Sequence, residues 1–230
     1  MIMMDNKIKH IPRIFKMYVA DAPLSWLMLC AGAYIISPLA IAVVDQTNLI
    51  TSAPVAASFL NEYPLINNLF LLGHIIFAIP ALLIGPWMFH ALWRNRNLWW
   101  HRQLGKAYVI CCLMSSASGF CLALANPHSI GAKAGFATLA TLWFIFTMKA
   151  YYSVRARDFK AHRRWMIRSY ALTYAFLMVK ALGFMLPYSQ MEISAAITIR
   201  SWLCWVPNFL FAEALIRTTN HQGKFVGWRK

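Results

Sequence analysis

The organisation of this chain is decided by one charged stretch in an apolar second half, Arg155-Ala-Arg157-Asp-Phe-Lys-Ala-His162-Arg163-Arg164-Trp165-Met166-Ile167-Arg168. A second stretch, sixty-one residues earlier, has the same Arg-x-Arg-x4-His-Arg spacing and reads Arg94-Asn-Arg96-Asn-Leu-Trp-Trp-His101-Arg102. Apolar runs long enough to cross a membrane flank both stretches. The two motifs therefore predict two turns between helices, on the same side of a bundle that contains an internal repeat.

The composition places the chain in a membrane. Its 230 residues are 60% hydrophobic and 13% charged, with a mean hydropathy of +0.52, whereas soluble domains are roughly 45–50% apolar and about 25% charged. The formal net charge is +15. Because the basic residues fall in short clusters between apolar runs, they indicate contact with lipid headgroups rather than with nucleic acid. The expected partner is the lipid bilayer.

Several kinds of site are disfavoured. The five cysteines lie inside apolar segments without CxxC or zinc-ligand spacing, so neither a disulfide framework nor a structural zinc site is expected. The sequence has no HExxH motif and no phosphate-cradling glycine loop. Only seven residues are acidic, which leaves little room for acid–base hydrolysis. Whether the protein is an enzyme is left open.

The hydropathy pattern predicts an all-α polytopic membrane protein with about six transmembrane helices, since about 20 apolar residues cross a bilayer core. The expected spans are Pro23–Val44, Leu65–Trp93, Leu104–Ala125, Lys133–Val154, Trp165–Leu186 and Ile199–Arg217. Residues 1–22 form a basic segment, either an amphipathic surface helix or a solvated tail, and residues 23–64 form the first span and an external loop. Residues 65–217 contain the duplicated hairpin (65–126 and 133–187), which forms a four-helix core, and residues 218–230 form a basic tail.

Basic residues predict the orientation. Four alternate segments, 1–22, 93–106, 155–168 and 217–230, hold 18 of the 22 Lys and Arg residues. Since cytoplasmic loops carry the excess of Lys and Arg, both termini are expected in the cytoplasm.

The repeated motif places two histidines at related positions. A parallel duplication has a pseudo-two-fold axis along the membrane normal, which would bring His101 and His162 to the same height. Such a pair could bind haem, ligate a metal or share an anion. His90 is expected in the same layer, so His90, His101 and His162 form an alternative metal site. In the opposing interpretation each histidine only caps a helix at the headgroup level.

Ionisable residues inside predicted spans mark further candidates, because a charge in a membrane is costly without a partner. Glu213 and Arg168 are expected at similar depth and therefore to pair. His74, Lys180 and Asn208 are expected in a second polar layer. His74 is either an axial haem ligand, a proton carrier, or a structural histidine bonded to a neighbouring helix.

Three runs carry a resemblance to a known family: His162-Arg-Arg-Trp-Met-Ile-Arg-Ser-Tyr-Ala-Leu-Thr173, His101-Arg-Gln-Leu-Gly-Lys-Ala-Tyr108 and Trp202-Leu-Cys-Trp-Val-Pro-Asn208. Over about residues 65–217 the chain resembles a bacterial membrane family called domain of unknown function 2306. The resemblance implies a multi-span protein of the bacterial inner (cell) membrane and implies no activity. His101-Arg-Gln-Leu-Gly is also similar to a helix start in two-haem b-type membrane cytochromes, although those have paired histidines at two depths.

These features lead to three functional hypotheses. The first is a redox protein that binds haem b through His74, His101 and His162 and exchanges electrons with a quinone or another electron-transfer partner. The second is a non-enzymatic transporter or sensor of a small ligand, based on the layer of His74, Lys180 and Asn208. The third is the metal site at His90, His101 and His162.

Overall fold

The computed structural model describes residues 65–89, 91–185 and 192–221, and these form helices and short turns with no strand among them. The all-α class is thus confirmed for the described part. The N-terminal segment 1–22, the first predicted span, the external loop, His90 and the tail beyond residue 221 lie outside the described residues.

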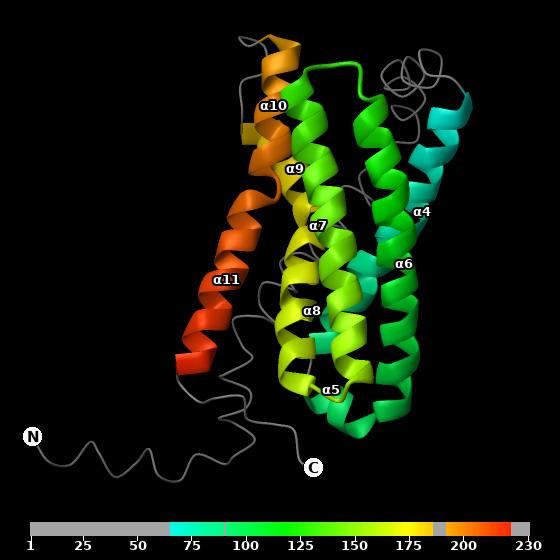
Figure 1. The fold of residues 1–230 in the computed structure, drawn as a ribbon, viewed down its shortest axis with the longest axis vertical. Helices are drawn as coiled ribbons and strands as arrows, with labels where there is room; N and C mark the ends of the chain where they lie inside the picture. Colours follow the sequence, from blue (N-terminus) through cyan, green and yellow to red (C-terminus); the bar gives the residue numbers. More distant parts are fainter. Residues whose placement is uncertain (1–64, 90, 186–191, 222–230) are drawn as a thin grey trace, which may run out of the picture.

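In the described residues, eight helices form an elongated bundle (Figure 1). They are α4 (Leu65–Phe89), α5 (Ala91–Arg96), α6 (Leu98–Ala125), α7 (Ile130–Arg155), α8 (Phe159–Thr173), α9 (Ala175–Met185), α10 (Ile193–Leu203) and α11 (Val206–His221). Helix α6 packs between α4 and α7, and α8 packs on the other side of α7. Helix α10 covers one half of α7, while α11 lies along α8 (Figure 1).

Both predicted motifs form connections at the same end of the bundle, which we call the basic end (Figure 1). The first motif supplies α5 and the start of α6. The second supplies the tight turn from α7 to α8, where Arg157 has a positive φ of 61° and the Asp158 side chain accepts a hydrogen bond from the Ala161 N–H at 2.9 Å. That N-cap stabilises the first turn of α8.

The helix boundaries differ from those predicted. Among the described residues, three helices are long and apolar enough to cross a membrane, Leu69–Phe89, Leu98–Ala125 and Ile130–Arg155. Helix α6 begins at Leu98 rather than Leu104, because the tryptophans and basic residues of the motif extend the helix. The predicted fifth span is divided at Tyr174 and the sixth at Cys204–Trp205. Pro207 explains the second break, since proline fits the first turn of a helix but not its interior.

Candidate functional site

Buried hydroxyl groups meet in the middle of the bundle. They belong to Tyr108 on α6, Thr147 on α7, and Ser169 and Thr173 on α8, and we call them the hydroxyl cluster. The Tyr108 hydroxyl lies 3.1 Å from the Ser169 Oγ and 3.2 Å from the Thr173 Oγ1. The Thr147 and Ser169 hydroxyls are 2.8 Å apart. Tyr108 and Ser169 are sixty-one residues apart, the spacing of the repeat.

The hydroxyl cluster has more short oxygen–oxygen contacts than hydroxyl hydrogens to form them. Thr147 donates to the Trp143 carbonyl at 2.8 Å and Thr173 donates to the Ser169 carbonyl at 3.1 Å. Ser169 is then the donor to Thr147. Each hydroxyl has one hydrogen, so Tyr108 can donate to Ser169 or to Thr173 but not to both at once. The cluster therefore has two hydrogen-bond arrangements of similar geometry.

Replacing Tyr108 with phenylalanine is expected to lower the unfolding free energy by about 1 kcal/mol, because Ser169 and Thr173 both lose a buried partner. Unfolding in mixed micelles with increasing SDS measures the change. The matched control is Tyr152→Phe, since Tyr152 is exposed and lies outside the hydroxyl cluster. Equal stability of the two variants would contradict the prediction.

The two motif histidines lie near each other at the basic end. Nδ1 of His162 donates a hydrogen bond to the Ala150 carbonyl at 2.8 Å. Burial lowers the pKa of His162 against the raising effect of this bond, and the nearby Arg94 guanidinium lowers it further. His101 interacts electrostatically with His162 and with Arg94. Arg94 itself is only 9% exposed, and it acts electrostatically on both rings.

His101 differs from His162 in its hydrogen bonding. Nδ1 of His101 is buried without a hydrogen-bond partner, whereas Nδ1 of His162 is bonded to a carbonyl. The described residues contain no group of three His, Cys, Asp or Glu side chains that could hold a metal. Since His90 lies outside the description, the three-histidine metal site stays a prediction.

His74 is bonded to the neighbouring helix α6. Its Nδ1 lies 2.9 Å from the Ser115 carbonyl and 3.1 Å from the Ser115 Oγ, which donates back to the His74 carbonyl at 3.0 Å. Gly119 permits this approach, since a Cβ there would lie 3.0 Å from the His74 Nδ1. Because a carbonyl can only accept, Nδ1 carries the proton in the neutral ring and Nε2 is an acceptor. Among the described residues no group bonds Nε2.

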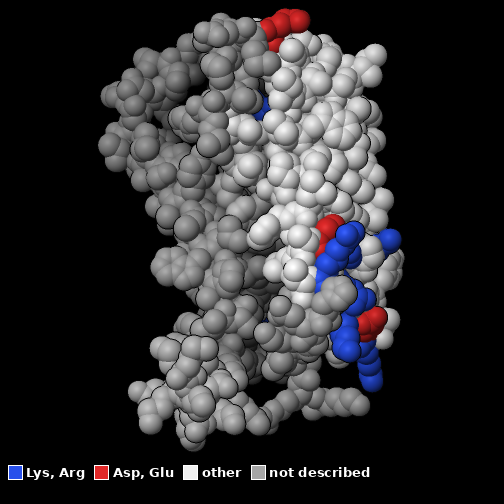
Figure 2. All heavy atoms as spheres, turned by 90° about the vertical axis from the view of Figure 1, so that its left-hand side faces the viewer, with Lys and Arg blue, Asp and Glu red and all other residues white. Residues whose placement is uncertain are grey.

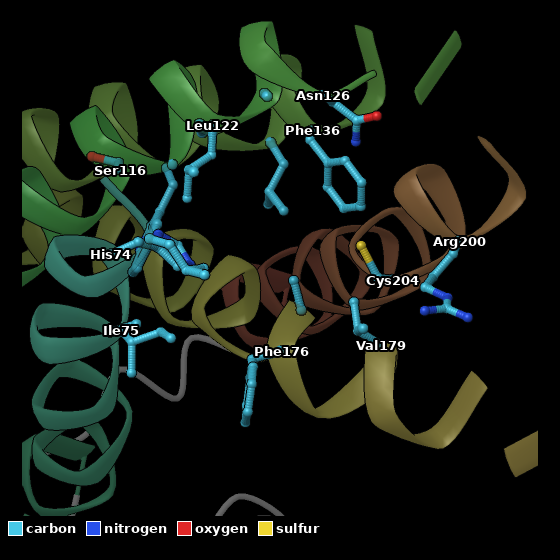
Figure 3. A pocket seen from close by; sticks show the side chains of 18 of the residues that line it. His74, Ile75, Ser116, Leu122, Asn126, Phe136, Phe176, Val179, Arg200 and Cys204 are labelled. Atoms are coloured by element: carbon cyan, nitrogen blue, oxygen red, sulfur yellow. The ribbon is translucent and has the colours of Figure 1, made fainter. Parts of the chain in front are cut away.

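His74 lines a cavity of about 640 Å³ between α4, α6, α7, α9 and α10 (Figure 3). The walls are mainly apolar, with Ile75, Leu122 and Phe136 on three of the helices. Polar side chains are few: His74 is on one wall, Arg200 is near the far side, Ser116 is on α6 and Asn126 follows it (Figure 3). His128, also after α6, completes this set. Thr173 belongs both to the cavity wall and to the hydroxyl cluster.

Two of the three residues predicted in the second polar layer, His74 and Asn208, have described side chains. Asn208 donates from Nδ2 to the Cys204 carbonyl at 3.1 Å, one turn earlier in the chain, so it is satisfied locally and is not part of the cavity wall. Lys180 lies on α9, and its side chain is outside the description. Of the two described side chains, His74 lines the cavity and Asn208 does not. Sequence depth gives the height of a residue but not the side of the helix on which it lies.

The pair expected between Arg168 and Glu213 is present and links α8 to α11. Arg168 donates from Nε and Nη2 to the two carboxylate oxygens of Glu213, the second bond being 3.0 Å long. The guanidinium also lies 4.5 Å from the ring centroid of Trp165. This geometry indicates a structural link between α8 and the middle of α11.

Comparison with known proteins gives one match. The model of a family described as predicted membrane protein (DUF2306) matches residues 71–216, more than half of the chain. The chain belongs to this family. The family resemblance drawn from the three sequence runs is thereby confirmed, and the likeness to b-type cytochromes gains no support. No curated protein and no solved structure matches.

The region that matches the DUF2306 model includes the cavity, the hydroxyl cluster and the basic-end histidines. Sequence reasoning missed Arg200, Ser115 and Thr173 as members of these sites. The helical periodicity could have indicated Ser115, because it lies on one face of α6 together with His101, Tyr108 and Cys112. Arg200 gave no such signal, since it lies where the boundary of a predicted span was uncertain.

Proposed function

We propose that this DUF2306 protein binds a small, mostly apolar molecule inside the membrane, as a transporter or sensor rather than as an enzyme. The observation that supports the proposal is the cavity that His74 lines. Its volume of about 640 Å³ falls within the 300–1,000 Å³ typical of ligand pockets. Apolar walls with a few separate polar groups are also usual for such sites.

The polar groups define what the molecule should carry. Nε2 of His74 is a hydrogen-bond acceptor, because Ser115 holds the proton on Nδ1. A ligand hydroxyl can donate to it. Arg200 borders the same cavity and adds a positive charge, which favours an electron-rich or acidic group at the other end of the molecule. The ligand class that fits is therefore an apolar chain or ring with a hydroxyl group.

This function fits the geometry better than a b-type haem. A haem held by two histidines needs both rings at one iron. Ser115, the partner of His74, follows His101 by 14 residues on α6, a rise of about 21 Å. The other histidine of the cavity wall, His128, lies beyond the end of α6, about 15 Å further along from Ser115. His74 therefore has no second imidazole beside it among the described residues.

The proposal is tested by photo-crosslinking with a dodecanol that carries a diazirine group, applied to the full chain in lipid nanodiscs. Labelled peptides are expected to come from the cavity walls. Ala78→Phe fills the cavity, since Ala78 lines it, and should reduce labelling about tenfold, the effect of losing roughly 1.4 kcal/mol of binding. The control is Ala134→Phe on the exposed face of α7.

A second variant tests the role assigned to His74. His74→Leu should reduce labelling by the alcohol and leave labelling by the matching diazirine alkane unchanged, because only the alcohol donates to Nε2. Labelling that is equal in Ala78→Phe, Ala134→Phe and the unmodified chain would overturn the proposal. An absorbance spectrum of the same sample, recorded with and without added haem, tests the redox alternative through its Soret band.

A further inference from the structure

The break between α8 and α9 interrupts a helix in the apolar part of the bundle. Figure 2 shows that Lys and Arg side chains gather towards the basic end, and that the face beyond them is largely without charge. Tyr174, where the break lies, follows Arg168 by six residues, a rise of about 9 Å along the helix. Residues 168–178 contain no proline and no glycine. The residues that usually break or kink a helix are therefore missing here.

The break leaves backbone groups without partners. The Leu177 N–H donates to the Tyr174 carbonyl at 3.0 Å, and not to the Thr173 carbonyl four residues before it. In a continuous helix the Ala175 N–H would donate to the Ala171 carbonyl. Within the described residues that bond is also absent, and no other group bonds the Ala175 N–H or the Thr173 carbonyl. Unbonded backbone is tolerated at membrane depth only where it is buried in protein or lines a cavity, and Thr173 and Ala175 both line the cavity.

At two other places in the bundle, a side chain bonds the carbonyl that a helix leaves unpaired. Pro86 has no N–H for the Leu82 carbonyl, four residues earlier, and the Tyr170 hydroxyl donates to that carbonyl at 3.1 Å. At the break between α10 and α11, Asn208 donates from Nδ2 to the Cys204 carbonyl at 3.1 Å. The described residues supply no such side chain at the break between α8 and α9. This difference indicates that the partner comes from the cavity.

A side-chain donor in the cavity wall is also unpaired. Trp143 lines the cavity, is 6% exposed and belongs to the same core cluster as Ala175. Its Nε1–H has no hydrogen-bond partner in the part of the chain that the structure describes, although buried polar atoms are nearly always bonded. The Thr147 and Ser169 hydroxyls, 2.8 Å apart, set the register of α7 against α8. Trp143 and Thr173 each lie one turn from this contact, in the same direction along the bundle.

We propose that the break between α8 and α9 is a subsite of the cavity that binds an O–H group. The Ala175 N–H and the Thr173 carbonyl need a group that accepts one hydrogen bond and donates another. A hydroxyl does both, whereas a carbonyl only accepts and an ammonium only donates. The O–H group belongs either to the ligand or to an ordered water. As a ligand subsite, the break rests on the function proposed above and adds a second hydroxyl-binding point to that of His74.

The first arm of the test detects bound water by solid-state NMR of the full chain in lipid nanodiscs. Labelling with ¹³C-carbonyl tyrosine and ¹⁵N-alanine selects the amides of Ala171 and Ala175, because these are the two alanines that follow a tyrosine. Ala171 is the internal control, since its N–H lies within α8. The Ala175 N–H is expected to show a cross-peak to water and to exchange with deuterium roughly tenfold faster than the Ala171 N–H.

The second arm adds dodecanol labelled with ¹³C at its hydroxyl-bearing carbon. If the ligand supplies the O–H group, the Ala175 N–H gains a cross-peak to that carbon and loses its cross-peak to water. Ala78→Phe, which fills the cavity, should abolish the contact with dodecanol, and Ala134→Phe should retain it. If water is the source, the cross-peak to water remains in the presence of dodecanol.

The two proposals fail in different ways. An Ala175 amide that behaves like the Ala171 amide in both arms would overturn the subsite, even where photo-crosslinking shows the alcohol in the cavity. A cross-peak from Ala175 to water, together with no crosslinking of the cavity walls, would overturn the proposed function and leave the subsite as a site for water.

Discussion

Replacing Gly85 with alanine is expected to destabilise the bundle by about 3 kcal/mol, at the upper end for overpacking. A Cβ at Gly85 would lie 1.9 Å from Cε2 of Tyr170 and 2.5 Å from its Cζ. Tyr170 is held in place, because it is 6% exposed and its hydroxyl donates to the Leu82 carbonyl at 3.1 Å. The ring cannot move aside without losing that bond and its packing in the core.

The matched control for Gly85→Ala is Gly105→Ala, since nothing lies within 4 Å of a Cβ built at Gly105. There alanine should raise the unfolding free energy by up to about 1 kcal/mol through helix propensity. Unfolding with SDS in mixed micelles measures both. In a Tyr170→Leu background, Gly85→Ala should cost much less than in the unmodified chain, which is the coupling expected of residues in contact. If Gly85→Ala lowers the unfolding free energy equally in both backgrounds, the loss of stability does not come from a clash with Tyr170.

Much of the architecture could be predicted because membrane helices leave strong local signals. Length, apolarity and the spacing of basic clusters located the helices and the two connections at the basic end, since the bilayer fixes the span length. The pairing of Arg168 with Glu213 followed from depth alone, because each charge needs a partner at its own level. The spacing of sixty-one residues also predicted related positions for His101 and His162, which lie at the same end of the bundle but differ in the hydrogen bonding of Nδ1.

Which side chains form each site depends on how each helix is rotated about its own axis. No single local sequence signal gives that rotation. His74 was expected either at a cofactor or bonded to a neighbouring helix. In the structure, Nδ1 of His74 is bonded to Ser115 on the neighbouring helix. The His74 side chain also lines the cavity, where its Nε2 is an acceptor. Asn208 was expected at a similar depth but bonds to the Cys204 carbonyl, one turn earlier at the end of α10. Two polar residues at one height can therefore face different surroundings.

The hydroxyl cluster was missed for a related reason. Ser and Thr are common in membrane helices, where their hydroxyls usually bond to a carbonyl of the preceding turn. Thr147 and Thr173 do so. Their additional contacts with Ser169 and Tyr108 come from three helices that are brought together only by tertiary packing. The hydroxyl cluster lies between the basic-end histidines and the cavity wall at Thr173. No sequence motif indicates this position.

Removing Glu213 alone should destabilise the protein more than removing its whole ion pair. Glu213→Leu leaves the Arg168 guanidinium in a largely enclosed place, and because both side chains keep some exposure, 17% and 22%, we expect a cost of about 1–3 kcal/mol, below that of a fully buried pair. The double variant Arg168→Met with Glu213→Leu leaves no charge behind. It should recover at least half of the loss, because replacing a pair by apolar residues is often nearly neutral.

The geometry of the pair predicts a third variant. Arg168→Lys keeps the charge but loses one of the two bonds to Glu213 and the guanidinium face against Trp165, since an ammonium cannot reproduce the planar fork. Its stability should fall between the unmodified chain and Glu213→Leu. The measurement is again unfolding in mixed micelles, with Arg155→Met, an exposed arginine on α7, as the control for loss of charge. If the double variant is no more stable than Glu213→Leu, the cost comes from lost contacts of Arg168 and Glu213 with the surrounding helices, and not from an unpaired charge.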